Sequence, residues 1–187
     1  LVDSHLVRWA REVGNDEVDT FIIPCDCPRF QSGDAKGLVK ASTRGDDLYI
    51  FVDPGNYSVT YQLFGYENHL SPDDHFQNLM RIIQAVSGRA HRISVIMPSL
   101  YGGRQHRRVS RESLDCAFAL QQLRDVGVKN IITFDAHDPR VMNAVPTMSF
   151  DNVMPTYQVL KCLLHHVPDV SFHKDNFMIV SPDEGAM

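Results

Sequence analysis

Four short apolar runs recur along the chain, and they constrain the fold more than any other feature of the sequence. They cover residues 48–52, 93–97, 131–134 and 177–180 and are rich in Val, Ile and Phe. Runs of this length and composition are typical of strands that are buried in a parallel sheet. We therefore expect four buried parallel strands.

The intervals between these runs carry apolar residues at helical spacing. Residues 71–74 supply an N-cap serine, a first-turn proline and a first-turn acid, and residues 76–86 then repeat with the period of an amphipathic helix. A second helical face covers 116–123 and is expected to end near Gly127, and a third covers 157–164. Alternating strands and helices predict an α/β fold, namely an open, mostly parallel sheet with helices on both faces.

Two other segments interrupt this pattern. Residues 27–47 read as a turn-rich hairpin in which Gly33 and Gly45 mark the turns. Residues 53–71 contain Pro, Gly and several aromatic residues, and they read as a loop that is either an insertion or a contact surface.

Composition narrows the classes of partner. The 187 residues are 43% hydrophobic, and the net charge of −5 comes from interspersed charges, which disfavours nucleic acid and membrane surfaces and favours small molecules. The opening residues do not resemble a signal peptide, so we expect a cytoplasmic protein with reduced cysteines. Cys25 and Cys27 could form half of a thiolate metal site, but the sequence holds no second pair to complete it.

Polar motifs follow three of the four predicted strands. In open α/β sheets ligands bind at the carboxyl ends of the strands, so these positions are the candidates for function. The first motif is PSLYGGRQHRR, in which Arg104, Arg107 and Arg108 are close together beside two glycines. Such a cluster suits phosphate oxygens, and the alternative is a solvated basic loop.

The other two motifs offer carboxylates and a histidine. In FDAHDP, Asp135 and His137 are two residues apart, and an extended segment would point both side chains the same way, toward a divalent metal such as Mg²⁺. The alternative is an Asp that caps a turn and a His that is satisfied locally. In SPDEG, Asp183 could be a further metal-facing carboxylate, although an ordinary turn is the favoured interpretation of that residue.

Taken in order, these motifs resemble the ribose-phosphate pyrophosphokinase family. YGGRQHRR is similar to that family's Y-G-x-x-R-Q-D-R-[RK], DAH to its D-x-H and SPDEGA to its S-P-D-x-G-G. The segment CPRFQSGD resembles its G-R-F-x-[DN]-G-E, and NLMRIIQAV and RESLDCAFA resemble further family segments, so the resemblance covers most of the chain.

The resemblance implies a phosphoribosyltransferase-like, ATP-binding domain over residues 1–167 and the start of a second domain over 168–187. The implied reaction transfers the β,γ-diphosphoryl group of MgATP to ribose 5-phosphate and gives phosphoribosyl diphosphate and AMP. It also implies a homo-oligomer in which subunits share the ATP site. Because the chain opens on Leu1 and the family's catalytic loops lie beyond Met187, we expect a fragment that is inactive alone, with no catalytic residue of its own.

Site residues carry over from the matching motifs. The expected ATP contacts are Phe30, Ser32, Asp34, Arg104, Gln105 and His137, with the first three reaching ATP of a neighbouring subunit. The expected Mg²⁺ ligands are His137, Asp135 and Asp183.

Several positions depart from the family pattern. They are His106 for Asp, Asp34 for Glu, Ser32 for Asp or Asn, Ala186 for Gly, and the extra residues 53–71. These departures keep an alternative open, a non-catalytic regulatory homologue that associates with an active synthase. A third alternative, an unrelated nucleotide-sensing or structural α/β module, requires all the motif matches to be coincidence.

Overall fold

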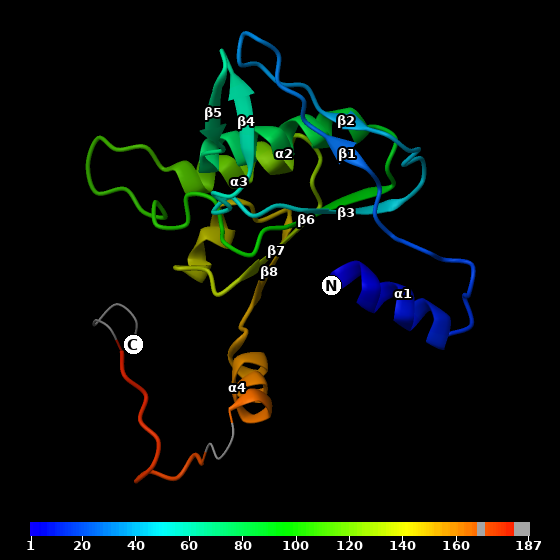
Figure 1. The fold of residues 1–187 in the computed structure, drawn as a ribbon. Coiled ribbons are helices and arrows are strands. Elements are labelled where there is room, and N and C mark those ends of the chain that lie inside the picture. The colour runs from blue at the N-terminus through cyan, green and yellow to red at the C-terminus, as the bar shows by residue number, and fades with distance from the viewer. Residues whose placement is uncertain (168–170, 182–187) are drawn as a thin grey trace. The chain divides into compact units, whose positions relative to one another are not determined.

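The structure is a computed structural model, and it describes residues 1–167 and 171–181. The chain divides into two compact units, Leu1–Asn152 and Val153–Met187. The first unit holds nearly all of the sheet structure (Figure 1). The expected domain boundary after residue 167 stays a prediction, because the next three residues lie outside the described part.

A four-stranded sheet forms the centre of the first unit. Its strands are β3 (Asp47–Phe51), β6 (Arg92–Ile96), β7 (Asn130–Phe134) and β8 (Ser149–Val153), in the spatial order β3-β6-β7-β8. β3 and β6 run parallel with Asp47 opposite Arg92, and β6 and β7 run parallel with Ser94 opposite Asn130. Three of the four predicted apolar runs are therefore neighbouring strands, as expected, but the prediction that all are buried is wrong for β3, where Tyr49 and Phe51 are more than half exposed.

Two helices connect these strands, α2 (Pro72–Val86) and α3 (Asp115–Asp125). The start of α2 is a capping box, because the Ser71 hydroxyl accepts a hydrogen bond from the Asp74 N–H and the Asp74 carboxylate accepts one from the Ser71 N–H. Gly127 follows α3 with a φ of +103°, a backbone conformation that glycine adopts without strain. Both helices confirm the sequence prediction.

The hydrophobic core lies between these helices and one face of the sheet. The largest fully buried apolar side chains in it are Ile83, Met97, Leu120, Leu123 and Ile131. α1 (Val2–Glu12), which the sequence analysis did not predict, lies on the other side of the sheet from α2 (Figure 1). The mostly parallel sheet with flanking helices confirms the α/β fold class.

Two small antiparallel pairs precede α2. β1 (Cys25–Asp26) pairs with β2 (Leu38–Val39), so a hairpin is present, but its first strand lies just before the predicted segment 27–47. β4 (Thr60–Leu63) pairs with β5 (Tyr66–His69), so the segment expected to be a loop contains a hairpin. Its two turn residues, Phe64 and Gly65, have φ values of 51° and 83°, as a type I′ turn requires.

The last part of the chain differs from expectation at one point. α4 (Thr156–His166) confirms the third predicted helix, and a 3₁₀ helix, η1 (Pro139–Ala144), precedes β8. Residues 177–180 form no strand, and Met178 and Ile179 are each 83% exposed, because no neighbouring strand in the described residues pairs with them. The fourth strand is instead β8, whose Phe150 packs against the core. No helix in the described part of the chain has the length and apolar character needed to cross a membrane.

Candidate functional site

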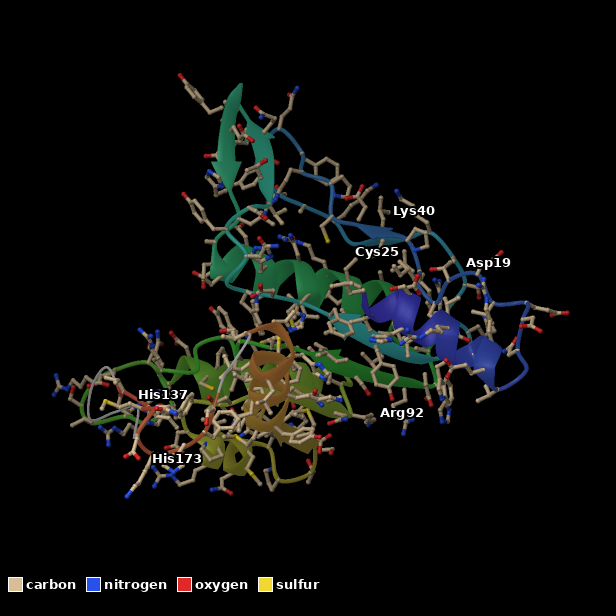
Figure 2. The ribbon with its side chains drawn as sticks, turned by 60° about the horizontal axis from the view of Figure 1, so that its bottom comes forward. Asp19, Cys25, Lys40, Arg92, His137 and His173 are labelled. Atoms are coloured by element: carbon tan, nitrogen blue, oxygen red, sulfur yellow. The ribbon has the colours of Figure 1, made fainter. Side chains whose placement is uncertain are left out.

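The parallel strands place two of the predicted motifs at one edge of the sheet. β6 leads into loop 97–108, and β7 leads into residues 135–138. Figure 2 shows His137 at the opposite end of the sheet from Arg92, the residue that opens β6. This is the carboxyl edge, where open α/β sheets bind their ligands.

Tyr101 fixes the base of loop 97–108 to the start of α2. Its hydroxyl donates a hydrogen bond of 2.7 Å to Asp73 Oδ1, and its ring stacks on Phe76 with the centroids 4.5 Å apart. The hydrogen bond to Asp73, together with partial burial, raises the pKa of Tyr101 to about 12. The phenol therefore stays protonated and bound to Asp73 at neutral pH.

The two glycines of the loop serve packing. Gly102 has a φ of +65°, and a Cβ there would lie 3.1 Å from the backbone nitrogen of Cys116 in the first turn of α3. At Gly103 a Cβ would lie 3.0 Å from the carbonyl oxygen of Leu100. Gly102 therefore lets the loop approach the start of α3, and Gly103 lets the loop turn tightly on Leu100.

A cavity of about 520 Å³ opens beside this loop at the carboxyl edge. Its lining includes Asp73, Tyr101, Gln105 and Asp115, together with Pro54 and Gly55 from the segment after β3. Of the predicted ATP contacts, Gln105 therefore lines the cavity, and the adjacent Arg104 is exposed.

His106 joins this loop to the segment after β7. Its Nε2 lies 3.5 Å from Asp138 Oδ2, and its ring centroid lies 5.1 Å from that of His137. The histidine that replaces the family's Asp thus contacts the second motif directly. The fold brings together residues from two motifs that are far apart in the sequence.

Asp138 is also bound by Arg140. The Arg140 guanidinium donates to both carboxylate oxygens at 2.6 to 3.1 Å, and the Arg140 N–H donates to Oδ1 at 2.9 Å. These hydrogen bonds hold the pKa of Asp138 well below its usual range, and the charge of His106 contributes less. Asp138 is therefore ionised at neutral pH and is already occupied by protein donors.

The chain bends directly after β7, which changes the basis of the metal prediction. Asp135 has a φ of +47°, so the extended geometry that we expected to align Asp135 with His137 is wrong. Ala136 is buried between them and donates its N–H to Asn152 Oδ1 at 2.9 Å, which holds the bend. The side chains of Asp135 and His137 remain exposed.

Two exposed donors are few for a metal. Within residues 1–167 and 171–181, no three His, Cys, Asp or Glu side chains are grouped to hold an ion. Magnesium prefers oxygen ligands and keeps several waters, so these two side chains could serve it only if phosphate oxygens and waters completed its shell. Asp183, the third predicted ligand, lies outside the described residues.

The remaining predicted ATP contacts lie together in the turn between β1 and β2. The N–H of Phe30 donates to the carbonyl of Asp34 at 2.7 Å, and the Ser32 hydroxyl donates to the Asp34 carboxylate at 2.9 Å. All three side chains are exposed. The turn is thus a compact unit that presents these residues to solvent.

Two side-chain pairs at the carboxyl edge of the sheet were not predicted from the sequence. They are Tyr101 with Asp73 and His106 with Asp138, and each joins positions that no periodicity relates. Asp73 lies in the first turn of α2, where the sequence interpretation used only Asp74 as the first-turn acid. The pairs depend on which loops meet at the edge, and that is a property of the tertiary fold.

The fold defines an α/β protein, and its candidate ligand site lies at the carboxyl ends of the strands. Residues 8–127 match the family described as the N-terminal domain of ribose phosphate pyrophosphokinase, a match over more than half of the chain. The chain therefore belongs to this family.

Individual relatives agree with the family match. The chain is 23% identical over 165 residues to a ribose-phosphate pyrophosphokinase of Bacillus caldolyticus and 24% identical over 143 residues to ribose-phosphate pyrophosphokinase 1 of Candida albicans. These matches cover 87% and 75% of the chain but 46% and 40% of the relatives, so the chain spans less than half of their length.

A solved structure supports the fold. Phosphoribosylpyrophosphate synthetase from Mycobacterium smegmatis superimposes with a TM-score of 0.63 at 18% identity. The superposition covers 85% of this chain and 49% of that protein. This likeness supports the α/β fold of the chain.

Proposed function

We propose that the chain is the nucleotide-binding half of a ribose-phosphate diphosphokinase, which transfers the diphosphoryl group of MgATP to ribose 5-phosphate and gives phosphoribosyl diphosphate and AMP. One observation carries this proposal. The two motifs that resemble the family converge at the carboxyl edge, where His106 lies beside His137. Membership in the family supports the reaction class.

Arg104 and Gln105 are the residues proposed to bind the phosphates of ATP. Diphosphoryl transfer spreads negative charge over the phosphate oxygens, and fixed donors that face these oxygens stabilise it. Arg104 offers a planar, permanently charged fork at the surface, and Gln105 offers an amide donor inside the cavity of about 520 Å³. The hydrogen-bonded base of the loop limits how far these donors must reorganise.

His137 and Asp135 are the residues proposed to hold Mg²⁺ together with the nucleotide. Both are exposed at the edge, and Asp183 is expected to add a carboxylate. Bound magnesium would neutralise phosphate charge and fix the conformation of the triphosphate. Asp138 is excluded from this set because Arg140 occupies both of its oxygens.

The exposed turn is proposed to act between subunits. Phe30, Ser32 and Asp34 would contact the adenine and ribose of ATP held by a neighbouring subunit, so the active form would be a homo-oligomer. The proposed location of the protein is the cytoplasm. The chain spans less than half of the relatives' length and does not contain the catalytic and ribose-phosphate loops that the family resemblance implies, so the chain alone is expected to be inactive.

A second candidate is the non-catalytic regulatory homologue. The observation that favours it is His106, which stands where the family has an Asp and contacts Asp138 and His137. A histidine in this position changes the charge that faces a bound metal-nucleotide.

One assay separates the two candidates. The full-length parent protein would be supplied with ATP, ribose 5-phosphate, Mg²⁺ and phosphate, and AMP and phosphoribosyl diphosphate would be followed together. Equal formation of both products supports the enzyme. A folded, oligomeric preparation that releases neither would overturn the proposal and favour the regulatory homologue.

A further inference from the structure

The turn between β1 and β2 has an exposed side and an anchored side. Phe30, Ser32 and Asp34 are exposed, whereas Arg29 and Gly33 are partly buried. The residues expected to reach the nucleotide therefore alternate with residues that contact the protein. The anchored side decides how the exposed side is presented.

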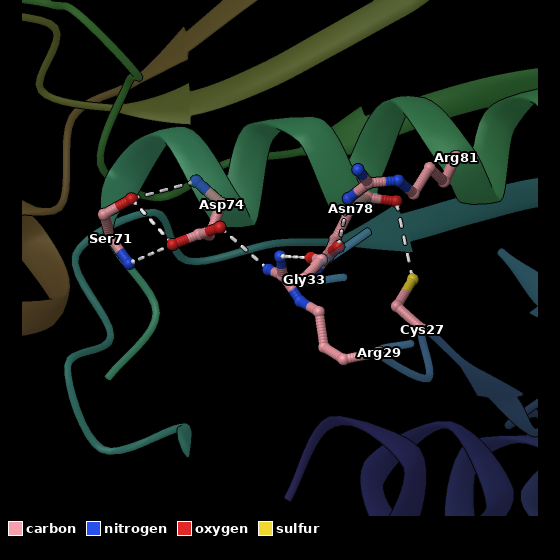
Figure 3. Close-up of polar contacts among 7 residues, drawn as sticks. All are labelled: Cys27, Arg29, Gly33, Ser71, Asp74, Asn78 and Arg81. Atoms are coloured by element: carbon pink, nitrogen blue, oxygen red, sulfur yellow. Dashed lines mark hydrogen bonds and ion pairs between the residues drawn. The ribbon is translucent and has the colours of Figure 1, made fainter. Parts of the chain in front are cut away.

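Arg29 makes the polar contacts of the anchored side, as Figure 3 shows. Its side chain is 11% exposed. One guanidinium nitrogen donates to Asp74 Oδ1 at 2.8 Å, and the other donates to the carbonyl oxygen of Gly33 at 2.9 Å. A single side chain thus ties the closing residue of the turn to the first turn of α2.

The β4–β5 hairpin supplies the remaining contacts. The Arg29 guanidinium carbon lies 4.4 Å from the centroid of the Tyr61 ring, within range of a cation–π interaction. A Cβ at Gly33 would lie 3.7 Å from Leu63, so the backbone of the turn lies near the hairpin as well. This hairpin is the segment that departs from the family pattern.

Asp74 connects these contacts to the start of α2. Its Oδ1 binds Arg29, while its Oδ2 accepts hydrogen bonds from the N–H and the hydroxyl of Ser71 at 3.0 and 2.9 Å. Both oxygens of one carboxylate are therefore used. The anchor of Arg29 is itself held in place by a helix cap.

We propose that Arg29 is a positioning residue that, clamped between Asp74 and the Tyr61 ring, sets the conformation of the turn and thereby the affinity for the nucleotide. This inference rests on the proposed function for its ligand, MgATP. Arg29 does not touch the nucleotide in this scheme. It acts through the turn, because its guanidinium binds the carbonyl oxygen of Gly33.

The test compares variants of the full-length parent protein. Arg29→Met keeps the apolar stem and removes the guanidinium, so we expect the KM for MgATP to rise about tenfold while kcat stays within about twofold. Arg29→Lys retains a charge but not the fork and should fall between wild type and Arg29→Met. Tyr61→Leu should raise the same KM about two- to fivefold.

The matched control is Arg92→Met. Arg92 binds Asp47 at 2.7 Å, the same kind of ion pair, but it lies at the opposite end of the sheet from His137 and is about half exposed (Figure 2). Its substitution should leave both kinetic constants unchanged. Equal effects of Arg92→Met and Arg29→Met would overturn the proposal, because they would indicate a general loss of stability.

Amide hydrogen exchange provides a readout that does not need activity. Arg29→Met should speed exchange at the Phe30 N–H, which is bonded to Asp34, and leave exchange in β6 and β7 unchanged. An unchanged KM and unchanged exchange would refute the role of Arg29. A wild-type protein without activity would refute the proposed function alone, since the exchange result still decides whether Arg29 orders the turn. If Arg29→Met fails to fold, Arg29→Lys and Tyr61→Leu decide by the same two measurements.

Discussion

Two regions carry the proposed nucleotide contacts, and their arginines differ in burial and in bonding partners. In the turn between β1 and β2, Arg29 is partly buried and has Asp74, the Gly33 carbonyl and the Tyr61 ring as partners. In loop 97–108 the base is fixed, but Arg104 is exposed. The cation that binds protein groups is surrounded by partners, whereas the cation proposed to bind the ligand stays accessible. Burial and partners, more than residue type, separate the two roles.

The largest effect is expected for substitution of the exposed arginine, Arg104. Arg104→Ala in the full-length parent removes a charge-assisted contact to ATP, which should cost about 1.5 to 3 kcal/mol in kcat/KM. The melting temperature should stay the same, because the side chain is exposed in the free protein. Steady-state kinetics beside thermal unfolding checks both statements. Unchanged kinetics would remove Arg104 from the site.

The next largest effect is on stability, and it concerns Gly37, which follows the anchored turn. Gly37 lies where β2 crosses α2, and a Cβ there would be 2.5 Å from the carbonyl oxygen of Arg81. Gly37→Ala should therefore lower the free energy of unfolding by about 1 to 3 kcal/mol. Denaturant unfolding measures it. Gly55→Ala is the control, because a Cβ there meets Asp53 at 3.4 Å, near ordinary contact, and the loss should be about 0.5 kcal/mol or less.

Acid should loosen the anchored side before it affects the core. Burial alone would raise the pKa of Asp74, but hydrogen bonds from Ser71 and Arg29 outweigh it and place that pKa below the ordinary value of 3.8. A depressed carboxyl pKa stabilises the fold above 3.8, and this stabilisation is lost as the pH falls through the folded-state value. Unfolding followed from pH 5 downward should show a shallower loss in Asp74→Asn than in wild type.

The smallest effect is spectroscopic and tests the fixed base of the exposed loop. With a pKa of about 12, Tyr101 should ionise later than an ordinary tyrosine when absorbance is followed in alkali. Its raised pKa favours the fold below pH 10, and this contribution disappears as the pH rises toward 12. In Asp73→Asn the pKa should fall toward 10. A difference titration against Tyr101→Phe isolates the signal from the other tyrosines.

Most of the central strands and helices could be predicted from the sequence, whereas the last strand of the sheet could not. β3, β6 and β7 were predictable because each is a short apolar run bounded by polar residues, although Tyr49 and Phe51 of β3 are more than half exposed. β8 was not, because Asp151 and Asn152 interrupt its apolar pattern, and the run at 177–180 was a more apolar but wrong choice. Apolar character indicates that a strand can form, whereas pairing depends on a neighbour.

The candidate site shows the same division. The strand-end rule located Gln105 and His137 correctly at the carboxyl edge. It could not predict that Asp135 bends the chain, that Arg140 occupies Asp138, or that His106 lies beside His137. Those facts depend on how two loops pack against each other, and a single sequence holds no periodic signal for such contacts.

Because Ser71 and Arg29 both bind the carboxylate of Asp74, these three positions are expected to be coupled in evolution. Ser71 and Arg29 each bind a different oxygen of the same side chain, so the energetic effects of substituting them should not be additive. A replacement that is tolerated at one of the three positions alters the cost of replacement at the other two. The helix start and the turn are therefore expected to vary as one unit among relatives, even though some forty residues separate them in the chain.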